Sequence, residues 1–150
     1  MKETYMREAL ALAKKAFEEN EVPVGAVIVC NGEIIASAYN ERETVADATA
    51  HAEVLAIRRA CEKLGRWRLS DCELYVTLEP CPMCAGAIVN AKLGAVYYGA
   101  KDPRGGAFGS IMDLRAYALY HRPAVCGGIL EGESLSLMRV FFEKKRKEKN

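Results

Sequence analysis

Two short motifs constrain this chain more than any other feature: His51-Ala52-Glu53 and Pro80-Cys81-Pro82-Met83-Cys84. Cysteines three apart at the start of a helix project toward the same side, and the partial positive charge of that terminus favours thiolates. His51 and Glu53 would point about 200° away from each other on the body of a helix, so both can serve one centre only beyond its N-terminal end. The chain must therefore fold so that two helix starts face a common point.

This ligand set predicts a catalytic zinc site. One histidine and two thiolates leave a fourth tetrahedral position open for water, which distinguishes catalytic from structural zinc. Glu53 then needs no contact with the metal, because its carboxylate can take a proton from the attacking water and deliver it to a departing amino group. We therefore predict one Zn²⁺ per chain, held by His51, Cys81 and Cys84, with Glu53 as general acid and base.

Two other interpretations of the cysteine pair are a redox dithiol and one half of a closed four-ligand zinc site. Pro82-Met83 in the middle of the pair, and a histidine triplet that opens another helix, disfavour the redox role. A further alternative that the sequence leaves open is a non-enzymatic protein in which zinc only stabilises the fold. A closed site would need a fourth ligand from residues without paired spacing, which we interpret as core thiols and a surface histidine: Cys30, Cys61, Cys72, Cys126 and His121.

Strand and helix patterns alternate along the rest of the chain. Asn31-Gly32 is a hairpin signal, and Asp47 and Thr49 offer capping oxygens for the helix that follows them. No linker or repeat divides the sequence, so we predict a single domain over 1–150, folded as a three-layer α/β/α sandwich on a central mixed five-stranded sheet. We expect helices over 4–19, 50–64, 82–91, 111–119 and from about 134, strands over 24–30, 33–38, 73–78, 95–100 and 124–130, and a glycine-rich loop over 101–109.

Charge and hydropathy limit the partners and the compartment. A formal net charge of +1 excludes a strongly basic coat, so a nucleic-acid partner would have to bind a local patch. No stretch approaches the roughly 18 apolar residues of a membrane span, and the N-terminus lacks the apolar segment of a signal peptide. We therefore expect a cytoplasmic protein that does not contact a membrane.

The end of the chain concentrates positive charge beside two aromatic residues, Phe141 and Phe142. Such a segment suits RNA, with phosphates held by charge and an unstacked base resting on a ring. The alternative is a solvated helix end, where lysines complement the helix dipole. Arg104, in the glycine-rich loop, would add a further phosphate contact. The basic residues of the tail are Lys144, Lys145, Arg146, Lys147 and Lys149.

The motifs closely resemble those of the bacterial tRNA-specific adenosine deaminases, in the cytidine deaminase superfamily. The resemblance covers nearly the whole chain, including 21–26, Tyr39-Asn40, 99–102, 109–114 and Phe141-Phe142 with the basic residues after it. It implies a cytidine-deaminase-like fold, a homodimer, and hydrolytic conversion of the wobble adenosine, the first anticodon base of an arginine tRNA, to inosine. The partner it implies is a tRNA anticodon stem-loop.

The resemblance also implies roles around the substrate base. Asn40 would hydrogen-bond the flipped base, Val24 and Ala52 would wall its pocket, and Asp102 would contact the neighbouring backbone or sugar. On local grounds Asn40 is also a normal turn residue and Asp102 a normal loop acid before proline. The nearest rival is a zinc deaminase of a free base such as guanine or cytosine, from which the basic tail and the Asp102 loop separate this sequence. Residues 41–46 carry no signal that assigns them a contact.

Overall fold

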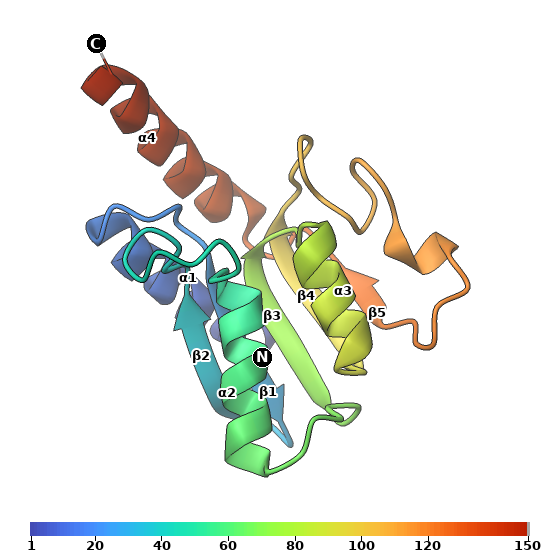
Figure 1. Ribbon diagram of the computed structural model, residues 1–150. Coiled ribbons are helices and arrows are strands. Elements are labelled where there is room, and N and C mark those ends of the chain that lie inside the picture. The colour runs from blue at the N-terminus through green and yellow to red at the C-terminus, as the bar shows by residue number, and fades with distance from the viewer. Residues whose placement is uncertain (150) are drawn as a thin grey trace.

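The computed structural model describes residues 1–149 and has a five-stranded mixed sheet with helices on both faces (Figure 1). The elements are α1 (Lys2–Glu18), β1 (Gly25–Cys30), β2 (Glu33–Tyr39), α2 (Ala52–Leu64), β3 (Cys72–Leu78), α3 (Pro82–Asn90), β4 (Ala95–Ala100), the 3₁₀ turn η1 (Leu114–Ala116), β5 (Ala124–Cys126) and α4 (Glu131–Lys149).

The sheet order is β2-β1-β3-β4-β5, with an antiparallel half and a parallel half. Asn31 and Gly32 both have positive φ, 51° and 79°, which is the backbone of the predicted tight hairpin between β1 and β2. β3 and β4 are parallel, so their carboxyl ends meet at one edge of the sheet. The Pro80–Cys84 motif and the glycine-rich loop therefore leave the sheet side by side.

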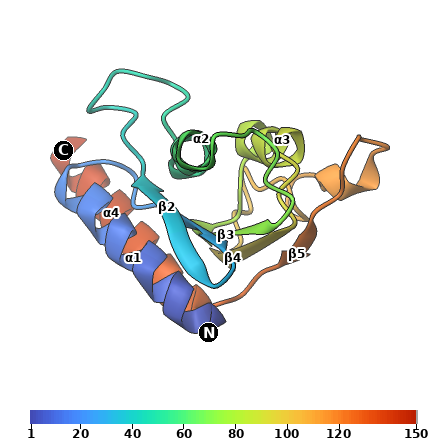
Figure 2. The same cartoon turned by 90° about the horizontal axis from the view of Figure 1, so that it is seen from below.

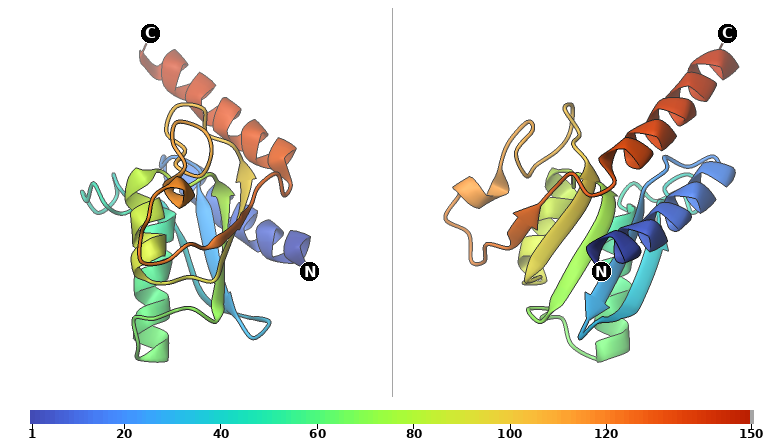
Figure 3. Two further views of the ribbon diagram at one scale, coloured as in Figure 1. Left: turned by 90° about the vertical axis from the view of Figure 1, so that its right-hand side faces the viewer. Right: turned by 180° about the vertical axis from the view of Figure 1, so that it is seen from behind.

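The predicted three-layer sandwich is confirmed. Seen from below, α2 and α3 cover one face of the sheet and α1 and α4 the other (Figure 2). β1 is buried on both faces: Ile28 belongs to the larger core with α2 and α3, whereas Val27 and Val29 pack with Met6 of α1. The C-terminal end of α4 extends past the body of the protein (Figure 3). None of the helices described over 1–149 is both long and apolar enough to cross a bilayer.

The predicted helix over 111–119 is wrong. Only Leu114–Ala116 forms a 3₁₀ turn, because the Asp113 carboxylate accepts a hydrogen bond from the Arg115 backbone N–H and also pairs with its guanidinium. This local interaction competes with a regular helix. Ile111 and Tyr117, which lie in the expected helix, have exposed side chains.

Two other boundaries differ from the prediction by three residues or more. β5 ends at Cys126 rather than at residue 130, because Gly127 lies against the Tyr98 ring and Gly128 adopts a φ of 89° that extended strands do not allow. α4 begins at Glu131, three residues before the expected position. The strand expected over 124–130 is therefore a short edge strand followed directly by the turn into α4.

Candidate active site

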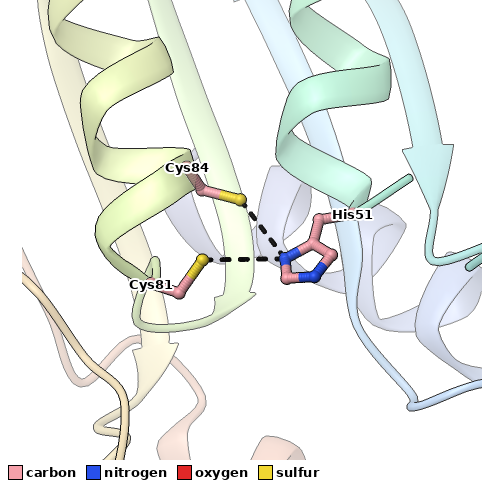
Figure 4. Close-up of side chains that lie close together, drawn as sticks. All are labelled: His51, Cys81 and Cys84. Atoms are coloured by element: carbon pink, nitrogen blue, oxygen red, sulfur yellow. Dashed lines mark hydrogen bonds between the residues drawn. The ribbon is translucent and has the colours of Figure 1, made fainter. Parts of the chain in front are cut away.

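Two helix N-termini converge at the carboxyl edge of the sheet (Figure 4). His51 is the N-cap residue of α2 and Cys81 is the N-cap residue of α3, and neither side chain caps its own helix. Pro82 occupies the first turn of α3, which suits its fixed φ, and Cys84 follows in the same turn. All three side chains are thereby free to point at one another across the gap between the helices.

The distances among these side chains fit a zinc ion. His51 Nδ1 lies 3.7 Å from Cys81 Sγ and 3.5 Å from Cys84 Sγ, and the three ligand atoms all lie within 4.8 Å of one another. In a tetrahedral site with normal zinc bond lengths, a nitrogen and a sulfur ligand are about 3.6 Å apart. The donor set and its spacing therefore match a three-ligand metal site.

Electrostatics at the site favours a thiolate. A hydrogen bond from the Cys84 thiol lowers the pKa of Cys81 to about 4, and the same bond, together with burial, raises the pKa of Cys84. The hydrogen bond with Cys81 also raises the pKa of His51. Metal coordination requires deprotonated cysteines, so a ready thiolate at this point is the state that a cation can bind.

Glu53 lies inside the same site. Its side chain is only 4% exposed, on the first turn of α2, and it lines the cleft together with His51 and Cys81. Burial, reinforced by the neighbouring Cys81 thiolate, raises the pKa of Glu53 to about 7. A buried carboxyl group beside a metal-ligand set is the arrangement that proton transfer requires.

Asn40 lines the cleft together with His51 and Glu53, and its side chain also caps the N-terminus of α2. Its Oδ1 accepts a hydrogen bond of 2.7 Å from the Ala52 backbone N–H. Asp47 instead bonds Thr49 within its own loop, so the predicted capping of α2 by Asp47 and Thr49 is wrong. Because an acceptor must face the Ala52 N–H, the side-chain amide has one orientation, and its NH₂ group is the half that Asn40 can offer to the cleft.

A cleft of about 650 Å³ joins the metal-ligand set to α4 and the Asp102 loop. This volume lies in the normal range of ligand pockets. Six other residues for which a substrate contact was predicted line it: Val24, Asp102, Arg104, Phe142, Lys145 and Arg146. Lys149 of the predicted basic tail also lines it, together with five residues that the sequence did not single out: Val22, Arg42, Leu78, Glu79 and Met138.

Comparison with known proteins identifies the family of the chain. The model of the MafB19-like deaminases matches residues 1–149. The chain belongs to the MafB19-like deaminase family. A tRNA-specific adenosine deaminase of Bacillus subtilis (strain 168) is 52% identical over 148 residues, which cover 98% of this chain and 92% of the relative. The predicted kinship with the bacterial tRNA-specific adenosine deaminases is thus confirmed, and the protein is a deaminase enzyme.

Solved structures give the deaminase the same fold. One, from biochemical and structural studies of A-to-I editing by tRNA:A34 deaminases at the wobble position of transfer RNA, is 47% identical with a TM-score of 0.88 and covers 89% of this chain and 98% of its own. The X-ray structure of guanine deaminase from Bacillus subtilis is 45% identical with a TM-score of 0.66 and covers 81% of this chain and 78% of its own. The predicted cytidine-deaminase-like fold is confirmed.

Three residues of the deaminase for which a substrate contact was predicted do not line this cleft. The Phe141 side chain is only 4% exposed and packs edge-on against Phe17 of α1. Ala52 is fully buried and does not line the cleft; its contribution is the backbone N–H that binds Asn40. Lys144 lies over the Phe17 ring instead of lining the cleft.

Sequence reasoning missed two buried carboxylates that hold the loops of the cleft. Glu21 accepts hydrogen bonds from the backbone of Glu43 and Thr44, and so shapes residues 41–46, to which sequence analysis assigned no contact. Glu79 accepts bonds from both ends of the Asp102 loop. The available signal was an acid directly beside an apolar run, before Val22-Pro23 and after Thr77-Leu78.

The remaining cysteines are not equivalent. Cys30 and Cys72 are buried as predicted and both approach the Asp71 carboxylate, which already pairs with Arg66 through two 2.9 Å hydrogen bonds. That pairing leaves the carboxylate poorly suited to a cation, unlike the His51 group. Cys126 is exposed, so its prediction as a core thiol is wrong, because β5 lies at the edge of the sheet.

Proposed function

We propose that this deaminase hydrolytically converts the wobble adenosine of a tRNA, the first anticodon base, to inosine, using one zinc ion per chain. The observation that carries the proposal is the charge around the cleft. Five basic side chains line the same cleft that holds His51, Cys81 and Glu53, in a chain whose net charge is only +1: Arg42, Arg104, Lys145, Arg146 and Lys149.

This concentration of charge favours a polyanionic substrate over a free base. Phosphates of RNA are bound by lysine and arginine, whereas a neutral purine needs only a closed polar pocket. The basic residues come from three separate segments: the 41–46 loop, the Asp102 loop and α4. A strand of RNA entering the cleft would meet charge on several sides, while its target base, flipped out of the stack, reaches Glu53.

The chemistry follows from the residues at the bottom of the cleft. His51, Cys81 and Cys84 would hold zinc, which when bound supplies the Lewis acidity that makes water a nucleophile at neutral pH. Glu53 takes a proton from the attacking water as the water oxygen bonds to C6 of adenine, and delivers a proton to the amino group, which leaves as ammonia. Asn40 donates from its NH₂ group to an acceptor of the base and fixes its orientation.

Metal analysis tests the ligand assignment. We expect about one zinc per chain in the wild type and less than about a tenth of that in Cys84→Ala, because two remaining ligands bind zinc weakly. Cys126→Ser is the matched control, since Cys126 is exposed and far along the sheet, and its zinc content should equal that of the wild type. Elemental analysis after gel filtration checks both, with circular dichroism to verify folding. A Cys84→Ala protein with full zinc content would contradict the assignment.

A product assay tests the substrate. Wild-type protein is offered an anticodon stem-loop with adenosine at the wobble position, guanine, cytosine and free cytidine under identical conditions. We expect inosine in the RNA and no product from the other three. Similarity to the Bacillus subtilis guanine deaminase makes guanine the second candidate. Conversion of guanine to xanthine without inosine in the RNA would replace the proposal by that alternative.

We also propose a cytoplasmic homodimer. Exposed apolar side chains cluster in the segment after the Asp102 loop, where a second copy would cover them: Ile111, Tyr117, Leu119 and Tyr120. Several large exposed apolar side chains within one segment favour a contact with a partner. Light scattering after gel filtration measures the mass; a monomer at micromolar concentration would contradict the dimer.

A further inference from the structure

Glu79 lies in the wall of the cleft, between the end of β3 and the cysteine motif. Its side chain is 2% exposed, yet four hydrogen-bond donors surround its carboxylate. The backbone N–H groups of Asp102, Phe108 and Ser110 donate over 3.1, 3.0 and 3.2 Å, and the Ser110 hydroxyl donates as well. One carboxylate therefore binds the first and the last residue of the 102–110 loop.

The loop that Glu79 holds carries two residues of the cleft. Asp102 and Arg104 line the cleft from this loop, and the Asp102 side chain in turn accepts hydrogen bonds from the backbone N–H groups of Arg104 and Gly105. The loop continues from β4 toward the orange segment of Figure 1. Without a fixed start and end, a nine-residue glycine-rich loop would sample many conformations, and both cleft residues would move with it.

The space around Glu79 is shaped for a carboxylate. A Cβ atom at Gly106 would lie 2.2 Å from Glu79 Cδ, so only glycine lets the loop pass this close. A glutamine would keep one acceptor oxygen but turn an NH₂ group toward two of the donors. The four donors around this buried group are matched by the two acceptor oxygens of a carboxylate, each of which accepts two of the hydrogen bonds.

We propose that Glu79 is a positioning residue of the deaminase: it fixes the 102–110 loop so that Asp102 and Arg104 stand at the edge of the cleft and bind the nucleotides beside the target base. The role rests on the proposed RNA substrate. The hydrogen bonds that the Glu79 carboxylate accepts all come from this loop, and none comes from His51, Cys81 or Cys84. It acts only through the loop, so its removal should weaken substrate binding and leave the chemistry of the bound substrate intact.

Glu79→Gln tests this role. We expect kcat/KM on the anticodon stem-loop to fall about 10- to 100-fold, as for other misplaced binding groups. The loss should appear in KM, with the single-turnover rate at saturating RNA within about 3-fold of the wild type and zinc content unchanged. Amide hydrogen exchange should accelerate at Phe108 and Ser110, whose N–H groups lose their acceptor.

A double-mutant cycle shows whether Glu79 acts through the loop. Asp102→Ala combined with Arg104→Ala removes the groups that the loop presents. Glu79→Gln lowers kcat/KM by one factor in the wild type and by another in that variant. We expect the second factor to be at least about 5-fold smaller than the first, because the positioned groups are already absent. A residue that only stabilises the fold would give independent, multiplicative effects.

Glu21→Gln is the matched control. Glu21 is also 2% exposed and also accepts backbone hydrogen bonds from a cleft loop, but its donors are Glu43 and Thr44. Its substitution should accelerate amide exchange at 43–44 and not at 108–110, and its effect on kcat/KM should multiply with that of the Asp102/Arg104 variant.

A second variant covers the case in which Glu79→Gln does not fold. Ser110→Ala removes one hydrogen-bond donor to Glu79 and should also raise KM, by a smaller factor.

The outcomes separate the two proposals. Wild-type protein that makes no inosine would contradict the proposed function, and the exchange rates would then decide by themselves whether Glu79 holds the loop. Active wild type with unchanged exchange and unchanged KM in Glu79→Gln would overturn the positioning role alone. A fall in the single-turnover rate with unchanged KM, or independent effects in the cycle, would also overturn it.

Discussion

Glu53→Ala should lower the rate of inosine formation by at least about 10³-fold while the protein keeps its fold and its zinc, because general acid and base catalysis is lost. The structure explains why the two properties separate. His51, Cys81 and Cys84 form the ligand group without Glu53, whose buried carboxylate lines the cleft beside them. The substitution removes the proton carrier between water and amino group, and no ligand.

The measurement pairs single-turnover kinetics on the stem-loop with elemental analysis and thermal unfolding. Glu53→Gln keeps the size of the side chain but cannot carry the proton, so it should be as inactive as Glu53→Ala. Glu62→Ala, an exposed acid on the same helix, is the control and should retain wild-type rates. Loss of zinc in Glu53→Ala would make Glu53 a ligand, and retained turnover would assign the proton transfer to another group.

The sequence predicted those parts of the site whose local structure depends only on neighbouring residues in the chain. The spacing of Cys81 and Cys84, with Pro82 between them, sets a helix start locally, and the same holds for His51 before Ala52. Because His51 at one helix N-terminus and the two cysteines at the other complete a metal site only together, the sequence predicts that the two helix N-termini face each other. The alternation of strand and helix patterns fixed the layers of the fold in the same way, since each amphipathic element can bury only one face.

The parts that sequence missed depend on contacts between distant residues. Phe141 and Phe142 look equivalent in the sequence, but only Phe141 faces α1, where Phe17 buries it. The cap of α2 comes from Asn40, twelve residues before the Ala52 N–H it binds. Glu79 receives its donors from residues 23 to 31 positions later. Local propensity carries no information about such pairs.

Phe141, Asn40 and Glu79 share one feature: each is a polar or aromatic side chain whose role depends on what lies beside it. A buried acid such as Glu79 is costly unless donors surround it, so an acid next to an apolar strand is a signal that a loop folds back over it. The same reasoning applies to Glu21, where burial acts to raise the pKa but hydrogen bonds from Thr44 and Glu43 outweigh it and lower the pKa below its ordinary value.

Deleting the residues after Phe142 should lower kcat/KM on the anticodon stem-loop by about 100-fold or more, because it removes three of the five basic side chains of the cleft. The fold should survive the deletion. Phe141 stays packed on Phe17 and anchors the shortened α4 to α1. The deletion removes the cation–π contacts of Lys144 with Phe17 and of Lys145 with Phe141, and the ion pair between Lys145 and Glu148, none of which joins α4 to the sheet. Zinc content should be unchanged, since the ligand group lies at the starts of α2 and α3.

A more specific prediction separates the lysines of the tail that line the cleft from those that do not. Lys145 and Lys149 are four residues apart and line the cleft, whereas Lys144 and Lys147 do not. Lys145→Ala with Lys149→Ala should weaken RNA binding about 10- to 100-fold and reduce the slope of log affinity against log salt by about 1.5. Lys144→Ala with Lys147→Ala changes the net charge equally and should cost less than about 3-fold, because long-range attraction is screened at physiological salt. Equal losses in the two double variants would mean that the tail attracts RNA only by its total charge, and unchanged activity after the deletion would show that α4 does not bind the substrate.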